Sequence, residues 1–205
     1  MTLSRRIRRR SSNNSMTDAS AAVHEMQYLF TKFGRNAGRE RRIMKKVGII
    51  MGSDSDLPII EKAVNVLKDL EIPYEVHIYS AHRTPVEARD FAVNARANGF
   101  GAIIAAAGMA AHLAGAIAAN TTLPVIGIPC KSSVLDGMDA LLSTVQMPTG
   151  IPVATVAING GANAALLAAE IIAVSDEELQ KKLDAKRAKD AAAVLEKDRT
   201  VMEKL

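Results

Sequence analysis

Residues 74–85, YEVHIYSAHRTP, decide the fold because they pass from one structural pattern directly into another. The first half is rich in β-branched and aromatic residues and predicts a strand over 74–79. The residues that follow, 86–97, have a helical pattern, and Pro85 suits a first helical turn. A strand that leads into a helix is the unit of a parallel α/β sheet. The loop 80–85 is therefore expected at the carboxyl edge of that sheet, where such folds bind ligands.

The same alternation continues along the chain from residue 47. Short apolar runs of the kind buried in parallel sheets predict strands at 47–51, 74–79, 101–106, 124–128 and 153–157. Helices are predicted at 57–70, 86–98, within 108–120 after a loop, at 134–145 and at 162–173. Ser175 and Glu178 form a capping box that begins a last, mostly charged helix at about 176–197. We expect an α/β fold with a five-stranded parallel sheet covered by helices on both faces, and a C-terminal helix that lies on the surface or across a neighbouring subunit.

The composition limits the class of protein. The chain has 205 residues, of which 48% are hydrophobic but only 3% aromatic, so Ala, Val, Ile and Leu must form the core. So few rings disfavour a surface that stacks nucleic-acid bases. The single cysteine, Cys130, excludes an internal disulfide and a multi-cysteine metal site, and it is expected to be a buried core residue.

The positive net charge of +4 comes from the N-terminal part of the chain. Residues 1–46 contain 12 Lys/Arg and 3 Asp/Glu (+9), whereas the remainder contains 14 and 19 (−5). The globular part is therefore mildly acidic and gives no reason to expect nucleic-acid binding.

Three parts are predicted along the chain. Residues 1–43 read as a basic, disordered extension without the apolar stretch of a secretory signal or a membrane span. Residues 44–175 are expected to form the catalytic domain, and 176–205 its C-terminal helix and tail. We expect a cytoplasmic protein, although an Arg- and Ser-rich leader of this kind could also direct import into an organelle.

Polar residues follow three of the predicted strands. In GSDSD (52–56), Gly52 permits a tight turn, and Ser53 with the next backbone amides can meet an anion at a helix start. Asp56 suits ribose hydroxyls, or alternatively a helix N-cap. The segment matches neither the Walker loop nor the dinucleotide fingerprint, and as a bare pattern it could be no more than a capped turn.

The second strand end, SAHRTP, places Ser80, His82 and Arg83 within four residues. Arginine suits a phosphate because its planar fork donates two parallel hydrogen bonds, and an imidazole suits proton transfer near neutral pH. The alternative is an exposed loop histidine beside a surface ion pair.

The third strand end is AGMAAHLAG (107–115), whose small residues, including Gly108, let the backbone approach a ligand closely. His112 falls in or just before the first turn of the following helix, where it could serve the site or simply pack at a helix end. His77 lies within a strand and is expected to be structural.

Together these segments resemble the class I N5-carboxyaminoimidazole ribonucleotide mutases of purine biosynthesis, over about residues 46–198. The motifs that carry the resemblance are VGIIMGSDSD (47–56), SAHRTP (80–85), AGMAAHLAG (107–115), LPVIGIP (123–129), STVQMPTGIPVATVAI (143–158) and ANAALLAA (162–169). The resemblance implies a three-layer, flavodoxin-like core, a homo-octamer and conversion of N5-carboxyaminoimidazole ribonucleotide to 4-carboxy-5-aminoimidazole ribonucleotide without ATP. It implies no metal, cofactor, nucleic acid or membrane, and a substrate supplied by an ATP-dependent carboxyaminoimidazole ribonucleotide synthase.

The resemblance also implies roles for the residues in these motifs. His82 falls on the catalytic histidine, and His112 on the motif histidine that marks class I. The expected substrate-binding residues are Gly52, Ser53, Asp56, Ser80, Arg83 and Gly108. Two positions depart from the family pattern, because Met109 stands where Gly is frequent and Ala114 where Pro is frequent.

Two other functions remain to be weighed. The nearest is the related carboxylase, which takes aminoimidazole ribonucleotide and carbon dioxide directly; the segment around His112 argues against it. The other is a non-enzymatic flavodoxin-like module. A receiver domain needs an acceptor aspartate after its third strand, where this chain has Ala106-Ala107-Gly108, and a flavin site usually has flanking aromatic residues, which these loops lack.

Overall fold

The computed structural model describes residues 44–205, and the extension predicted for 1–43 lies outside the described residues. Its centre is a five-stranded sheet with the order β2-β1-β3-β4-β5 and parallel pairing throughout. The strands are β1 Lys46–Met51, β2 Tyr74–Ile78, β3 Phe100–Gly108, β4 Val125–Cys130 and β5 Ala154–Thr155. This is the flavodoxin-like order, so the predicted fold class is confirmed. The chain reverses its direction of travel across the sheet at β1 and β3, and such a switch point opens a crevice at the carboxyl edge.

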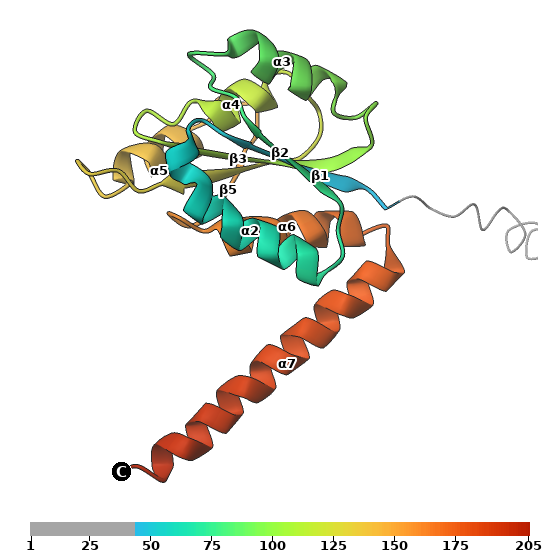
Figure 1. Ribbon diagram of the computed structural model, residues 1–205, viewed down its shortest axis with the longest axis vertical. Coiled ribbons are helices and arrows are strands. Elements are labelled where there is room, and N and C mark those ends of the chain that lie inside the picture. The colour runs from blue at the N-terminus through green and yellow to red at the C-terminus, as the bar shows by residue number, and fades with distance from the viewer. Residues whose placement is uncertain (1–43) are drawn as a thin grey trace, which may run out of the picture. The chain divides into compact units, whose positions relative to one another are not determined.

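Helices cover both faces of the sheet, as Figure 1 shows. The helices on one face are α2 Leu57–Asp69 and α6 Gly161–Ala173; those on the other are α3 Pro85–Asn94, α4 Leu113–Ala118 and α5 Met138–Val145. Successive residues of β1 serve opposite faces, because Ile49 joins the core under α2 and α6 while Ile50 joins the core under α3 and α4. A strand buried on both faces must be apolar at every position, which is why the predicted runs show no polar alternation.

The alanine-rich helix α6 lies against α2 at backbone distance. A Cβ atom added at Gly161 would stand 2.1 Å from the carbonyl oxygen of Ile59, so only glycine fits there. Ala164, Ala165 and Ala168 are fully buried on the same helix. Close packing of small residues thus replaces the aromatic residues that the chain lacks.

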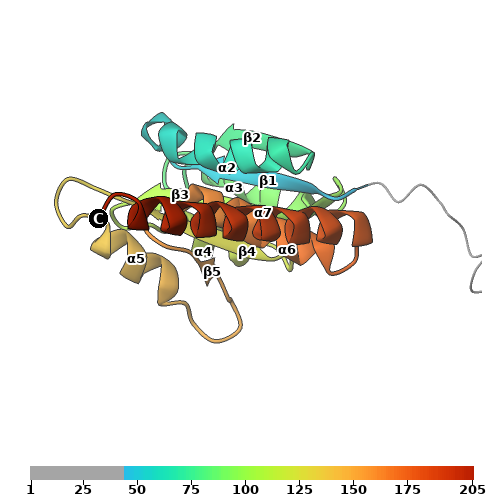
Figure 2. The same cartoon turned by 90° about the horizontal axis from the view of Figure 1, so that it is seen from below.

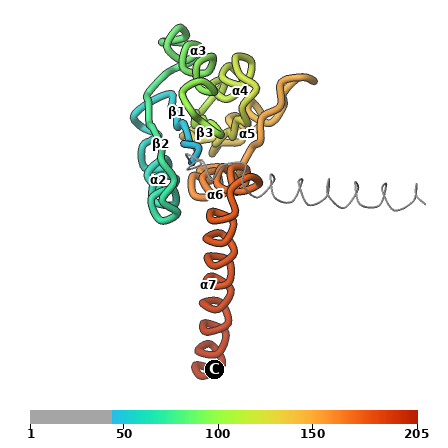
Figure 3. The backbone as a smooth tube through the Cα atoms, turned by 90° about the vertical axis from the view of Figure 1, so that its right-hand side faces the viewer, coloured from blue at the N-terminus to red at the C-terminus, as the bar shows by residue number. Residues whose placement is uncertain are grey.

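The last helix, α7 Glu177–Met202, is anchored at its beginning only. Leu179 and Leu183 are buried, and Lys182 and Arg187 form ion pairs with Glu71 and Glu170. Beyond this segment the helix extends away from the body of the domain (Figures 1 and 3), so that it passes in front of the domain when seen from below (Figure 2). The predicted surface helix is present and five residues longer at its end than expected.

Several boundaries differ from the prediction: α3 ends at Asn94 instead of 98, and α5 begins at Met138 instead of 134. Asp176, not Ser175, caps α7, because its side chain accepts a 3.1 Å hydrogen bond from the amide of Leu179. The helix expected within 108–120 is confined to α4, since the chain remains extended to Gly108 and then turns. The fifth strand pairs over two residues instead of the five expected.

No helix among residues 44–205 has the length and apolar character needed to cross a membrane.

Candidate active site

A pocket of about 620 Å³ opens at the carboxyl edge of the sheet, among the loops that follow β1, β2, β3 and β4. It brings together all eight of the residues predicted from three separate segments: Gly52, Ser53, Asp56, Ser80, His82, Arg83, Gly108 and His112. The topology explains this meeting, because parallel strands present their carboxyl ends at one edge.

The loop after β2 is closed by its own hydroxyl groups. The Oγ of Ser80 accepts hydrogen bonds from the amides of Arg83 (3.2 Å) and His82 (3.4 Å). The Oγ1 of Thr84 accepts from the Ser80 amide (2.7 Å) and donates to the Ser80 carbonyl (3.2 Å). Hydroxyl groups commonly hold turns in this way. Ser80 therefore shapes the loop that presents His82 and Arg83, whose side chains are both exposed to the pocket.

Two contacts join this loop to its neighbours. Arg83 donates a 2.7 Å hydrogen bond through Nη2 to the carbonyl oxygen of Gly52, in the loop after β1. The ring of His82 stands edge-on to the ring of His112, with 5.6 Å between centroids. His112 is the N-cap residue of α4, which agrees with its predicted place at the helix start.

Asp56 is a buried carboxylate at the floor of the pocket. It occupies the N-cap position of α2, but its side chain makes no capping hydrogen bond, so the alternative role as a helix cap is wrong. Burial raises the pKa of Asp56, and the thiol of Cys130 opposes part of that rise. Burial and the nearby Asp56 together raise the pKa of Cys130 to about 12, so this cysteine is an inert thiol as well as a core residue.

The pocket also contains residues that the sequence reasoning missed. Lys131 and Ser132 follow β4 and form part of the wall. A signal was available, because they follow the predicted strand 124–128 within four residues, at the same edge of the sheet as the other three loops. Ser55 and Ala110 belong to motifs that were recognised but were not themselves singled out, and Met109 was noted only as a departure from the family pattern.

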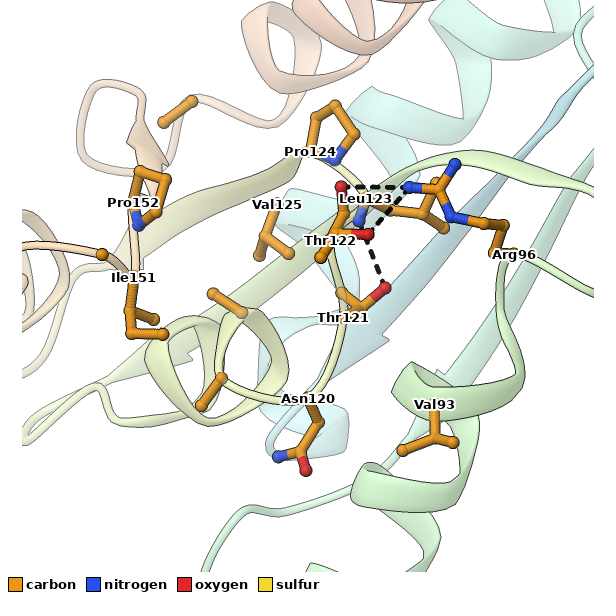
Figure 4. A pocket seen from close by; sticks show the side chains of 14 residues that line it. Val93, Arg96, Asn120, Thr121, Thr122, Leu123, Pro124, Val125, Ile151 and Pro152 are labelled. Carbon is orange, nitrogen blue, oxygen red and sulfur yellow. Dashed lines mark hydrogen bonds between the residues drawn. The ribbon is translucent and has the colours of Figure 1, made fainter.

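A larger hollow of about 1020 Å³ lies at the opposite, amino edge of the sheet (Figure 4). Its one charged lining residue, Arg96, already donates hydrogen bonds to the carbonyl and hydroxyl oxygens of Thr122. The remaining lining is apolar or uncharged, with Val93, Val125 and Ile151 around the opening. The chemistry therefore belongs to the smaller pocket. Within residues 44–205, no group of three or more His, Cys, Asp or Glu side chains gathers as a set of metal ligands.

Comparison with known proteins agrees with this geometry. The family model described as AIR carboxylase matches residues 46–193, which is most of the chain. The chain belongs to the AIR carboxylase family. Within the family it is 57% identical over 140 residues to the N5-carboxyaminoimidazole ribonucleotide mutase of Pyrococcus abyssi, covering 68% of this chain and 80% of that one. It is also 54% identical over 145 residues to the phosphoribosylaminoimidazole carboxylase of Saccharomyces cerevisiae, covering 71% of this chain but 25% of that one.

A solved structure of the family has the same architecture. The crystal structure of Treponema denticola PurE superposes with a TM-score of 0.70 at 31% identity, over 76% of this chain and 98% of that chain.

Proposed function

We propose that the protein is an N5-carboxyaminoimidazole ribonucleotide mutase, which converts its substrate to 4-carboxy-5-aminoimidazole ribonucleotide without ATP. The observation that carries this proposal is the meeting of His82, Arg83 and Asp56 in one pocket of a chain so similar to mutases over its α/β core. The reaction lies in purine biosynthesis, and its substrate is a small ribonucleotide.

The pocket offers a group for each part of such a substrate. Arg83 and the amides beside Ser53 suit the phosphate, since a guanidinium and the backbone N–H groups of a tight turn both bind anions. Asp56 is a buried acceptor for the ribose hydroxyls. Binding energy at these remote groups would hold the reacting imidazole ring in place. The small residues around Gly108 leave room for the ring to lie against the backbone.

His82 would move the proton that the rearrangement requires. The bond between the carboxyl carbon and the exocyclic nitrogen breaks, and carbon dioxide stays in the pocket while His82 gives a proton to the nitrogen. Ring carbon 4 then forms the new bond to carbon dioxide, and His82 takes back the proton that carbon 4 loses. The imidazole ends as it began, so the reaction consumes no proton. His112, edge-on to His82, would orient it.

The alternative is the carboxylase reaction that the name of the yeast relative states. One assay separates the two: one sample receives N5-carboxyaminoimidazole ribonucleotide, and the other receives aminoimidazole ribonucleotide with modest bicarbonate, both without ATP. Fast conversion in the first sample alone is the expected result. Efficient conversion in the second would establish the carboxylase, and conversion in neither by a folded protein would refute both.

We also propose a cytoplasmic homo-octamer supplied by an ATP-dependent carboxyaminoimidazole ribonucleotide synthase. Exposed apolar side chains support assembly, because α5 and the loop before it present a stripe of Val134, Leu135, Met138, Leu142 and Val145. This stripe and the apolar hollow of Figure 4 are each a surface that a neighbouring copy could cover. Light scattering on the purified protein tests the octamer directly.

A further inference from the structure

The pocket has a second cation in addition to Arg83. Arg83 follows β2 and Lys131 follows β4, and β1 and β3 lie between these strands. Three inter-strand spacings separate the ends of β2 and β4 by about 14 Å, so the two cationic side chains enter the pocket from opposite sides. A pocket built this way suits a substrate with one anionic group at each end.

Asn159 fixes the position of Lys131 through the backbone. The Oδ1 of Asn159 accepts a 2.8 Å hydrogen bond from the amide of Lys131, and the amide of Asn159 donates a 2.9 Å bond to the carbonyl of Pro129. Asn159 therefore forms hydrogen bonds with the backbone on both sides of Cys130. It does so with a φ of 58°, a left-handed conformation that asparagine tolerates better than most residues.

The two hydrogen bonds of Asn159 lie beyond the point where the pairing between β4 and β5 ends. β5 pairs with β4 only through Ala154 and Thr155, and one further bond runs from the amide of Val156 to Gly127. Without Asn159, the end of β4 would have no partner on its β5 side beyond that bond. Asn159 thus continues the edge of the sheet as far as the pocket wall, through its backbone amide and its side chain.

The loop after Lys131 turns back so that Gly137 packs against the backbone of Lys131. A Cβ atom at Gly137, which has a φ of 92°, would lie 3.1 Å from the Cα of Lys131, so this return needs glycine. The Nζ of Lys131 is 3.0 Å from a carboxylate oxygen of Asp136, and their side chains are 57% and 80% exposed. An exposed ion pair of this kind contributes little, so another anion can take the place of Asp136.

We propose that Lys131 is a second anion-binding residue of the pocket, which receives the migrating carboxylate of the substrate, and that Asn159 is the positioning residue that holds it there. This inference rests on the proposed function, in which Arg83 binds the phosphate at the other end. When substrate binds, the Lys131 ammonium leaves Asp136 and pairs with the substrate carboxylate. The backbone of Lys131 is held in place by Asn159 throughout.

Four variants test the inference in the mutase assay. Asn159→Gly keeps the left-handed backbone and the backbone amide donor but loses the Oδ1 acceptor. Asn159→Asp keeps the backbone amide donor and also a side-chain oxygen acceptor at this position. Lys131→Met removes the cation, and the fourth variant combines Lys131→Met with Asn159→Gly. We expect KM to rise about tenfold in Asn159→Gly and in Lys131→Met, which corresponds to about 1.4 kcal/mol of binding. Asn159→Asp is expected to keep a KM within about threefold of wild type.

The double variant decides whether the two residues act together. If Asn159 acts through Lys131, the double variant has the KM of Lys131→Met alone, because no cation remains to be positioned. A KM that multiplies the two single effects would overturn the positioning role. A wild-type KM in Lys131→Met would overturn the anion-binding role, even if Asn159→Gly failed to fold. Failure of the wild-type protein to convert the substrate would instead refute the proposed function.

Discussion

The guanidinium of Arg83 lies 2.7 Å from the carbonyl oxygen of Gly52 and donates a hydrogen bond to it. This bond joins the loops after two neighbouring strands, β2 and β1, at the rim of the pocket. Arg83 thereby spends one of its five donors on the protein, which fixes the direction of the planar fork and leaves donors for a phosphate.

Arg83→Lys should therefore impair binding although it preserves the charge. A lysine ammonium lacks the planar fork that can bind the Gly52 carbonyl and a phosphate at the same time. We therefore expect KM to rise about 10- to 100-fold, which matches the loss of a hydrogen bond to a charged group worth about 1.5–3 kcal/mol. Steady-state kinetics measure it. The matched control is Arg89→Lys, on an exposed arginine of α3 outside the pocket, which should leave KM unchanged.

His82→Asn should separate binding from chemistry. Asparagine keeps a polar side chain but cannot carry the proton, so kcat is expected to fall about 100- to 10,000-fold with little change in substrate affinity. The control is His77→Asn: this ring lies in β2, stacked 5.0 Å from Tyr79 and outside the pocket. Equal losses of kcat in both variants, or full turnover in His82→Asn, would contradict the role of His82.

Asp56→Asn should raise the thermal stability of the protein at neutral pH and weaken substrate binding. Because burial raises the pKa of Asp56 above its ordinary value of 3.8, the unfolded chain loses this proton first as the pH rises. Wild-type stability therefore falls as the pH rises from about that value through the raised pKa, and it stays lowered at neutral pH. We expect Asp56→Asn to melt a few degrees higher than wild type at pH 7, with a difference that shrinks towards pH 4.

Differential scanning calorimetry at several pH values measures this difference. A gap in Tm that does not change with pH would show that the asparagine acts through packing and not through charge. The same variant should bind the substrate more weakly, since an amide is a poorer acceptor for two ribose hydroxyls than a carboxylate.

Met109 offers a test of backbone strain at the site. It has a φ of 55°, in the left-handed region that favours glycine. Met109→Gly should stabilise the fold by about 0.5–1 kcal/mol, because relief of a strain of about 1–2 kcal/mol exceeds the entropic cost of glycine. Met109→Ala removes the same exposed side chain but keeps the Cβ atom, so it should give no gain. Equal stability of the two variants in urea unfolding would argue against strain.

The sequence predicted what depends on local pattern and on sheet topology. Four strands fell close to their apolar runs, and the motif residues met in one pocket because parallel strands end at one edge. The fifth strand was overestimated, because three of the five residues in the run 153–157 are β-branched, but the length of its ladder depends on how long β4 remains alongside. Ser175 and Asp176 are both good caps, and no local rule separates two such neighbours. Lys131 was missed because it lies between the recognised motifs 123–129 and 143–158, in a loop without a histidine or arginine.

The position of Asn159 in the chain determines how early the pocket can form during protein synthesis. A ribosome makes the chain from its N-terminus, so all four histidines, the last of them His112, are made well before residue 159. A nascent chain that has reached β4 carries the groups for proton transfer but lacks the side chain that grips Lys131. The wall of the pocket is thus among the last parts of the sheet to be secured, and an interrupted chain that stops before residue 159 would contain the catalytic histidine without a complete place to use it.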